Sequence, residues 1–426
     1  MGWQVHKLGD LCTIEKGNTG ITKAIAGEYP LVVLGEERKT HNEYQFEGDA
    51  VIIPLVSSTG HGHKSMKRIH FQSGKFALGS ILCAVIPKDI SMVSAQYLFR
   101  YLDLNKENEL VARMHGMANV SLPMSAIADI DIPLPPLKEQ IEIVERLGGL
   151  EKSNRKILDE LSNQITFLKN LRQQILQDAI QGKLVPHNPD DEPAGKLLEH
   201  IKAEKELLVK QKKIRKEKPL PPIKPEEIPF EIPEGWIWCR LGTVIESASG
   251  GTPERNNLAY YNGRVSWLKS GELNDGLIIN PSEEKITEAG LHNSSAKVFH
   301  TGTLLIALYG ATAGKLGILQ FPSSTNQAIC GLFQNSFILT KYLFYYLIKW
   351  REKMIQDSWG QAQPNISQKY LRHFLLALPP LSEQYRIVQK IDQLMQTCDE
   401  LEQTVRQNQN YTQELLQVAL KEALNP

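Results

Sequence analysis

The segment Leu134-Pro-Pro-Leu-Lys-Glu-Gln140 occurs a second time as Leu378-Pro-Pro-Leu-Ser-Glu-Gln384, 244 residues later. Each copy follows a short apolar run and opens a long stretch without proline. Paired prolines are excluded from a helix interior but suit its first turn, where an acidic residue also favours the positive end of the helix dipole. Each copy therefore predicts the end of a strand, a hinge and the start of a long helix.

Apolar residues recur in both predicted helices at alternating spacings of four and three, and the two series match at the same offset of 244. This pattern is typical of a coiled coil, and the polar residues that interrupt it can fix register and partner. Since each helix must run back between two modules, we expect the helices to pack antiparallel. The predicted seam positions are Ile143, Leu147, Leu150, Asn154, Ile157, Leu161, Gln164, Leu168, Leu171 and Ile175, and Ile387, Ile391, Leu394, Cys398, Leu401, Val405, Asn408, Thr412, Leu415 and Ala419.

Gly2-Trp3 near the start of the chain recurs as Gly235-Trp236, so each long helix is preceded by a repeated segment. We interpret each of these segments as a globular module. Short apolar runs bounded by Gly, Pro, Ser or Asn predict strands, so the fold class is α/β, with β-rich α+β modules and an internal pseudo-twofold repeat. The modules diverge between matching ends, as expected of one scaffold that presents two surfaces. The predicted order is a first module (1–134), a long helix (135–183), a charged helix with a proline-rich linker (184–234), a second module (235–378) and a second long helix (379–426).

The chain has 426 residues with 48 basic and 48 acidic side chains, so its formal net charge is zero. Global charge therefore neither favours nor opposes nucleic-acid binding. The five cysteines are scattered and form no C-x-x-C pair, which fits a reducing compartment and no structural metal site. There is no run of 18 apolar residues and no N-terminal signal peptide, so we predict a cytoplasmic protein.

Catalytic motifs are missing from the sequence. The segment 310–315 resembles a phosphate loop, but only three residues separate its glycines and Leu316 stands where Ser or Thr would hold magnesium. His61 and His63 have no Cys, Asp or Glu at ligand spacing. The Leu-Pro-Pro-Leu segments also differ from the Asn/Asp-Pro-Pro-aromatic tetrapeptide of amino-methyltransferases. We therefore predict that the chain is not an enzyme and holds no metal or cofactor.

Two polar loops follow a strand that the modules share, at 48–53 in the first and 302–307 in the second. Small residues, hydrogen-bonding side chains and cations in such loops can approach phosphates and reach base edges. The basic run 210–218 is either a solvated face or a further nucleic-acid or partner contact. The residues predicted to bind DNA are Ser57, Thr59, His61, His63, Lys64, Lys67 and Arg68 in the first module and Tyr309, Thr312, Lys315, Asn326 and Gln327 in the second.

These features resemble the specificity (S) subunit of type I restriction–modification enzymes over nearly the whole chain. The resemblance rests on both hinge segments, Gly182-Lys-Leu-Val-Pro186, Ile232-Pro-Glu-Gly-Trp236 and the loop at 307–317. It implies that each module is a target recognition domain reading one half of a bipartite double-stranded DNA site, and that the helices set the spacer and dock two modification (M) subunits. It also implies that S-adenosylmethionine belongs to the M subunits, and that ATP and magnesium act with restriction (R) subunits.

Two other functions fit the same sequence. The chain could be the specificity subunit of a type II-like methyltransferase system, in which the number of partners differs. It could also be a coiled-coil scaffold with two protein-binding modules, which its overall neutrality leaves open. Polar, cationic loops favour DNA over protein as the ligand.

Overall fold

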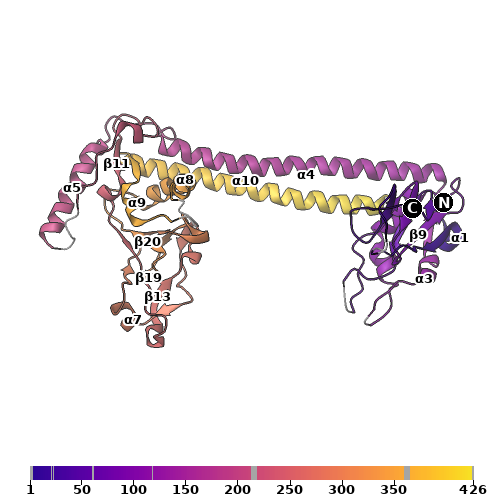
Figure 1. Cartoon of the computed structure of the whole chain (residues 1–426). Helices are drawn as coiled ribbons and strands as arrows, with labels where there is room; N and C mark the ends of the chain where they lie inside the picture. The colour runs from indigo at the N-terminus through magenta and orange to yellow at the C-terminus, as the bar shows by residue number, and fades with distance from the viewer. Residues whose placement is uncertain are drawn as a thin grey trace. The chain divides into compact units, whose positions relative to one another are not determined.

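The computed structural model describes residues 3–20, 22, 24–59, 62–117, 119–212, 218–358 and 365–424. The chain forms two compact units, one of residues 1–164 with 405–426 and one of residues 165–404. Each unit holds one globular module and parts of the two long helices (Figure 1). Within the described ranges, no helix has the length and apolar content needed to cross a bilayer.

The two long helices are α4 (Leu137–Ile180) and α10 (Leu381–Glu422), and they lie side by side in Figure 1. In the first unit, Asn154 Nδ2 donates to the Thr412 carbonyl oxygen at 2.8 Å. In the second unit, Arg172 of α4 forms ion pairs at 2.7 Å with two carboxylates of α10. Residue numbers rise along one helix as they fall along the other, which confirms the predicted antiparallel pairing.

One of the two predicted rows of the helix seam is wrong over its later part, although Ile143 and Ile387 at its start are buried as predicted. The row that includes Leu147, Leu161 and Cys398 is buried as expected, but four residues of the other row are between 46% and 69% exposed. In α4 the position one residue later is half-buried instead, and at this position Arg172 forms its ion pairs with α10. The same displacement occurs at equivalent positions of both helices, and the exposed residues are Ile157, Leu171, Leu401 and Leu415.

The first module combines two four-stranded sheets with a two-stranded one. Its strands are β1 (Gln4–Lys7), β2 (Cys12–Lys16), β3 (Tyr29–Val32), β4 (Lys39–His41), β5 (Phe46–Glu47), β6 (Ala50–Pro54), β7 (His70–Gln72), β8 (Lys75–Leu78), β9 (Leu82–Pro87) and β10 (Asp131–Leu134). The sheet orders are β1-β10, β2-β9-β6-β7 and β4-β3-β8-β5. The helices are α1 (Leu8–Leu11), α2 (Ala95–Leu104) and α3 (Met124–Ala128), with a π-helical turn at Glu107–Val111.

The second module contains a two-stranded, a four-stranded and a five-stranded sheet. Its strands are β11 (Ile237–Arg240), β12 (Ser247–Ser249), β13 (Tyr261–Leu268), β14 (Gly276–Ile278), β15 (Lys285–Ile286), β16 (Val298–Phe299), β17 (Leu304–Ala307), β18 (Leu316–Leu319), β19 (Ser323–Thr325), β20 (Ile329–Leu332) and β21 (Leu375–Leu378). The helices are α6 (Leu241–Val244), α7 (Glu288–His292), α8 (Thr340–Asp357) and α9 (Gln368–His373), preceded in the chain by α5 (Ala194–Lys210). Short 3₁₀ turns lie at Pro225–Glu227, Leu258–Tyr260, Ser270–Glu272 and Gly310–Thr312.

The two modules share one strand topology. The order β12-β20-β17-β18 repeats β2-β9-β6-β7, and β15-β13-β19-β16 repeats β4-β3-β8-β5. In both copies of the latter sheet the two central strands are parallel and the outer pairs are antiparallel. The second module adds β14 beside β18. The repeat predicted from the hinge segments therefore extends through both modules.

A buried glutamine fixes each hinge. Gln140 is fully buried, and its Oε1 accepts from the Ser94 amide, at the start of α2, at 2.8 Å. Its Nε2 donates to the carbonyl oxygens of Met92 and Pro135 at 2.9 and 2.8 Å. Gln384 makes the equivalent three bonds to the start of α8 and to the second hinge, at 2.8, 3.2 and 3.2 Å. Each glutamine thus joins a module helix to a long helix.

The linker between α4 and β11 packs on the second hinge. His187 Nδ1 lies 2.8 Å from Glu383 Oε1, while Trp236 Nε1 donates to the other oxygen of the same carboxylate at 3.1 Å. Asp191 forms an ion pair with Arg386 at 2.6 Å. The linker is therefore held to α10 by polar contacts as well as by apolar packing.

The pH dependence of the second hinge follows from Asp191, because the Arg386 guanidinium holds the pKa of this carboxyl below its usual range. A depressed pKa stabilises the folded state above the unfolded value of about 3.9, and the contribution is lost as pH falls through the folded pKa. We expect Asp191→Asn to lower the free energy of unfolding at pH 7 by on the order of 1 kcal/mol. Urea unfolding should show the gap to the unsubstituted protein closing below about pH 4; a gap independent of pH would contradict this account.

Candidate nucleic-acid interface

The first predicted DNA loop joins β6 to β7 and is ordered by its own polar side chains. Ser57 Oγ donates to the His63 carbonyl oxygen at 2.6 Å, and Thr59 Oγ1 lies 2.8 Å from Ser65 Oγ. These bonds connect the two described arms of the loop, residues 57–59 and 62–65, and Lys64 is exposed on the second arm.

The cations of this loop differ in their surroundings. Lys64 and Lys67 are exposed, and within the described ranges neither forms an ion pair. Arg68 pairs with Glu36 at 2.8 Å, and the guanidinium lowers the pKa of that carboxyl. Two lysines are therefore available to phosphates, whereas the charge of Arg68 is already balanced. His61 lies outside the described residues, as does most of the basic run at 210–218.

A polar cluster beside this loop was missed by sequence reasoning. Arg38 Nε donates to Gln72 Oε1 at 3.1 Å, and its Nη1 lies 3.2 Å from His70 Nδ1. Burial, together with the nearby Arg38, lowers the pKa of His70 to about 4, so the ring is neutral at pH 7 and can accept from the guanidinium. The sequence carried no signal for this cluster, because sheet pairing brings together residues from separate segments.

The second predicted loop, residues 309–315, joins β17 to β18 and is fixed on α8. Gly310 and Gly314 adopt left-handed backbone conformations with φ of 79° and 78°, which favour glycine. Arg351 Nε donates to the Gly314 carbonyl oxygen at 2.9 Å, and the same guanidinium binds Asp275 through both nitrogens. Neither partner was predicted. The loop is thus a rigid element on which side chains are presented.

The structure brings Asn326 and Gln327 to the same sheet end as this second loop. The Leu308 amide donates to the Ala328 carbonyl oxygen at 2.8 Å, so the end of β17 lies beside the start of β20. Gln327 is exposed and accepts a hydrogen bond from Thr252, while Asn326 is half-buried. The other predicted residues of the loop are half-buried, and they are Tyr309, Thr312 and Lys315.

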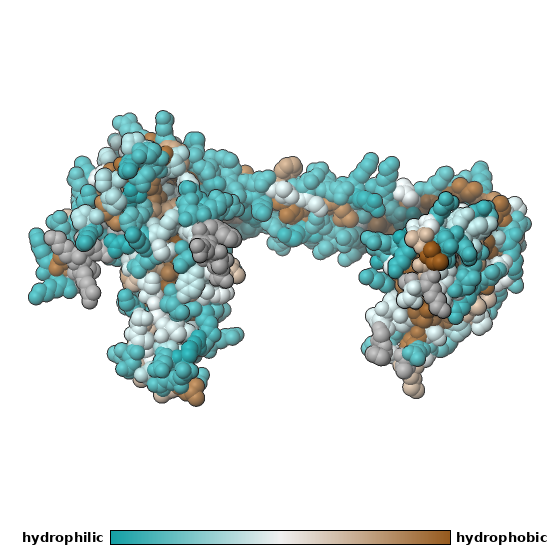
Figure 2. Space-filling model, in the orientation of Figure 1, coloured by the Kyte–Doolittle hydropathy of each residue, from teal (hydrophilic) through white to brown (hydrophobic). Residues whose placement is uncertain are grey.

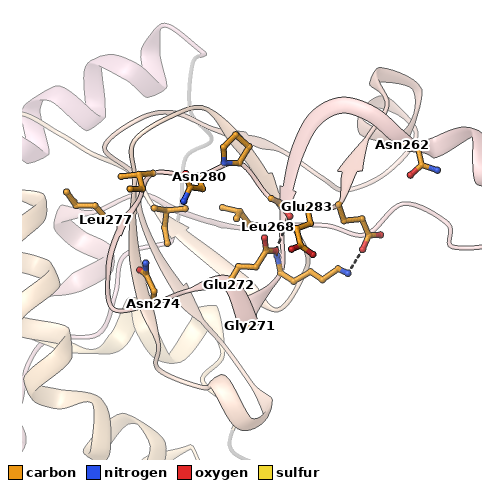
Figure 3. A pocket seen from close by; sticks show the side chains of 14 residues that line it. Asn262, Leu268, Gly271, Glu272, Asn274, Leu277, Asn280 and Glu283 are labelled. Carbon is orange, nitrogen blue, oxygen red and sulfur yellow. Dashed lines mark hydrogen bonds and ion pairs between the residues drawn. The ribbon is translucent and has the colours of Figure 1, made fainter.

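A hollow of about 780 Å³ in the second unit is unsuited to DNA. Figure 3 shows carboxylates and amides in its lining, such as Glu272, Glu283 and Asn274. Lys269, also in the lining, forms an ion pair with Glu284. Carboxylates repel phosphates, so this hollow is not part of the candidate interface. Among the described residues, no group of three or more His, Cys, Asp or Glu side chains could hold a metal ion. The polar lining consists of Asn262, Glu272, Asn274, Asn280, Glu283, Glu284, Lys269 and Ser282.

The two predicted loops are equivalent hairpins, because β6 and β17 hold the same place in the repeated topology, as do β7 and β18. The first connection spans residues 55–69 and the second spans 308–315, so they differ in length as well as in side chains. A duplicated scaffold that carries two different polar loops defines a two-module recognition protein.

Comparison with known proteins gives the family. The model of the type I restriction modification DNA specificity domain matches residues 1–176 and 233–409, well over half of the chain. The chain therefore belongs to the family of type I restriction–modification DNA specificity proteins. Its curated relatives are specificity subunits of type I restriction enzymes.

Individual relatives cover the chain to different extents. The specificity subunit of the EcoAI enzyme of Escherichia coli is 33% identical over 328 residues, which cover 65% of this chain and 55% of that protein. The EcoDI specificity subunit of the same organism is 25% identical over 431 residues and covers 98% and 88%. The chain spans about half the length of the EcoAI and EcoEI subunits that it matches.

Solved structures support the fold class. The HsdS subunit of Thermoanaerobacter tengcongensis has a TM-score of 0.60 at 19% identity, covering 99% of this chain and 96% of that chain. A chain from a type I R-M system, solved to study its assembly and conformational transition, has a TM-score of 0.65 at 18% identity and covers 100% and 98%. The predicted fold of two modules on long antiparallel helices is confirmed.

Proposed function

We propose that this chain is the non-catalytic, sequence-specific DNA-binding subunit of a type I restriction–modification complex, and that each module reads one half of a bipartite site. The observation that carries the proposal is the repeat: one strand topology occurs twice, with different polar loops on equivalent hairpins. Equivalent strand topologies place the loops alike on each module, while different side chains select different bases. Such a subunit acts where the DNA is, in the cytoplasm.

The partners proposed for this chain are two M subunits, joined by R subunits in the full complex. S-adenosylmethionine would belong to the M subunits, and ATP and magnesium to the R subunits, so that this chain needs no cofactor. Four apolar residues of the long helices support docking, because they are about half exposed and face away from the seam. Figure 2 shows brown side chains along the otherwise teal surface of the helices.

These exposed residues form two equivalent patches. Asn154 contacts Thr412, so Ile157 and Leu415 lie near one level of the helix pair in the first unit. Arg172 contacts the 399–402 turn, which places Leu171 and Leu401 near one level in the second unit. In an antiparallel helix pair, residues that are displaced from the seam by the same angle around each helix axis lie on the same side of the pair. The duplicated patches suit two copies of one partner, which we propose are the M subunits.

The helices are also proposed to set the spacer between the half-sites. Helix α4 is continuous over 44 residues and α10 over 42. At about 1.5 Å per residue, 44 residues extend about 66 Å, and duplex DNA rises about 3.4 Å per base pair. Recognition elements joined by helices of this length can address two sequences separated by roughly one helical turn or more.

The first test concerns phosphate contacts. Lys64→Ala and Lys67→Ala should each weaken binding of the full chain to all duplexes, and reduce the slope of log K against log salt by about 0.9 per lost contact. The control is Lys169→Ala, which removes an exposed lysine of α4 far along the chain from either loop. Fluorescence anisotropy over a salt series measures both quantities. Equal slopes for the unsubstituted chain and the three variants would show that DNA binds to another surface.

A further inference from the structure

The turn that carries Gln327 in the second module has a structural counterpart in the first module. The Asn326 amide donates to the last residue of β13 at 2.9 Å, and its carbonyl oxygen accepts from the first residue of β20 at 3.2 Å. Gly79 makes the same two bonds, with the last residue of β3 and the first residue of β9, both at 3.0 Å. Ser80 therefore stands where Gln327 stands, although the two turns share no sequence pattern.

This turn lies beside the start of the candidate DNA loop in both modules. The Leu55 amide donates to the Ile81 carbonyl oxygen at 2.9 Å, as the Leu308 amide does to the Ala328 carbonyl oxygen at 2.8 Å. The first of these bonds joins the residue that opens the β6–β7 loop to the residue that follows Ser80. The exposed Ser80 thus belongs to the same end of the sheet as that loop.

A second segment packs directly on the turn. Gly17 follows β2, and a Cβ atom at this position would lie 2.4 Å from the Gly79 carbonyl oxygen. A Cβ atom at Gly250, which follows β12, would lie 2.4 Å from the Asn326 carbonyl oxygen. Both copies therefore need glycine, because the two backbones touch. Asn18 comes next in the first module and is exposed beside the turn.

The backbone around Asn18 is fixed by hydrogen bonds. Its amide donates to Gln45 Oε1 at 3.0 Å, and Gln45 Nε2 donates to the Lys16 carbonyl oxygen at 2.9 Å. Asn18 Oδ1 accepts from Thr19 Oγ1 at 3.3 Å. Within the described ranges, Asn18 Nδ2 and Ser80 Oγ form no hydrogen bond. Two exposed polar groups on a fixed backbone are therefore left for a ligand.

The charge of this surface suits DNA. The segments 16–20 and 78–82 contain one cation, Lys16, and no acidic residue. Lys16 is exposed and, in the part of the chain that the structure describes, forms no ion pair. A cation that contacts a phosphate fixes the position of a protein on the duplex, and small polar side chains beside it can bond to base edges.

We propose that Lys16, Asn18 and Ser80 form a second DNA-reading element of the first module, in which Lys16 contacts a phosphate while Asn18 and Ser80 contact base edges. The ligand is the half-site assigned to this module, so the inference rests on the proposed function. Because Ser80 and Gln327 hold equivalent positions, this turn is one place where the two modules select different bases.

The test selects binding sites from a random duplex library with the full chain and its variants, and then measures affinity for the selected duplexes. Asn18→Ala and Ser80→Ala should each weaken binding to the selected site by at least about fivefold and relax base preference within one half-site. The other half-site and the spacer should stay intact. Ser80→Gln, which supplies the residue of the second module, should change the preferred base in the same half-site.

Lys16→Ala should weaken binding to all duplexes alike and reduce the slope of log K against log salt by about 0.9, without changing either half-site. The control is Ser73→Ala. Ser73 is an exposed serine that follows β7, at the end of the β6–β7 hairpin opposite the candidate DNA loop. It should leave affinity and both half-sites unchanged. Equal urea midpoints for all variants show that each one is folded.

The outcomes separate this inference from the proposed function. If the unsubstituted chain selects two half-sites and neither changes in the Asn18 and Ser80 variants, the inference is overturned and the proposed function stands. A uniform loss of affinity for all duplexes in these variants would also overturn it, because it would show contacts to phosphates only. Failure of the unsubstituted chain to select a bipartite site would contradict the proposed function itself.

Discussion

Gln140→Leu is expected to lower the free energy of unfolding by about 3 kcal/mol or more, a large fraction of the stability of a typical domain. The substitution removes three hydrogen bonds made by a side chain with no exposed surface. It leaves the Ser94 amide and the carbonyl oxygens of Met92 and Pro135 without these partners. An unsatisfied buried polar group costs about 1–3 kcal/mol. The decrease in the free energy of unfolding therefore comes from the backbone groups that lose their partners, rather than from the leucine side chain.

The repeat provides the comparison for this prediction. Gln384→Leu should cause a similar loss in the second unit, because Gln384 makes the equivalent three bonds. Gln413→Leu, at an exposed position of α10 in the first unit, is the control and should change stability by less than about 0.5 kcal/mol. Urea unfolding, monitored by circular dichroism, measures the free energy of unfolding of all three variants. If Gln140→Leu behaved like the control, the hinge glutamine would not be what joins the module to the long helix.

Ile157→Asp combined with Leu415→Asp is expected to remove one of two M subunits from the complex. Each of these apolar side chains is already about half buried, so burying the rest on docking contributes roughly 1 kcal/mol, and a carboxylate placed in an apolar contact adds a desolvation cost. The pair should therefore weaken docking at one patch by at least about a hundredfold. Adding Leu171→Asp and Leu401→Asp should remove the second M subunit as well.

Native mass spectrometry of the co-expressed complex measures directly how many M subunits are bound to each chain. DNA binding by the isolated chain should stay unchanged in each variant, because the patches lie outside the candidate DNA loops. Ile279→Asp is the control, since Ile279 is 66% exposed in the second module and belongs to neither patch. Retention of two M subunits by the fourfold variant would show that they dock on another surface.

The fold was largely predictable because its determinants are local and occur twice. The double proline at each hinge stops a strand and starts a helix, and the apolar spacing that follows is typical of a packed helix. The phase of the seam was not predictable in full. Ile157 and Leu158 are both apolar, and the sequence does not distinguish a row that packs on the partner helix from one that stays exposed. The pairing of Arg172 across the seam depends on the assembled structure.

The candidate DNA site was predictable only as loops. Gly-rich, polar stretches after a shared strand indicated the two hairpins, and the structure places them on equivalent strands. The groups that hold them were missed, because Arg38 reaches Gln72, and Arg351 reaches Asp275, only after distant strands and helices have come together. Long-range pairs of this kind leave no periodicity in the sequence.

Selection of binding sites from a random duplex library by the full chain tests the central claim most directly. We expect two short, different sequence blocks separated by a spacer of fixed length and no preferred sequence. Repeating the selection with Asn326→Ala and Gln327→Ala should change the block read by the second module and leave the other block and the spacer intact. A single continuous motif, or a change in both blocks, would contradict the account in which each module reads one half-site.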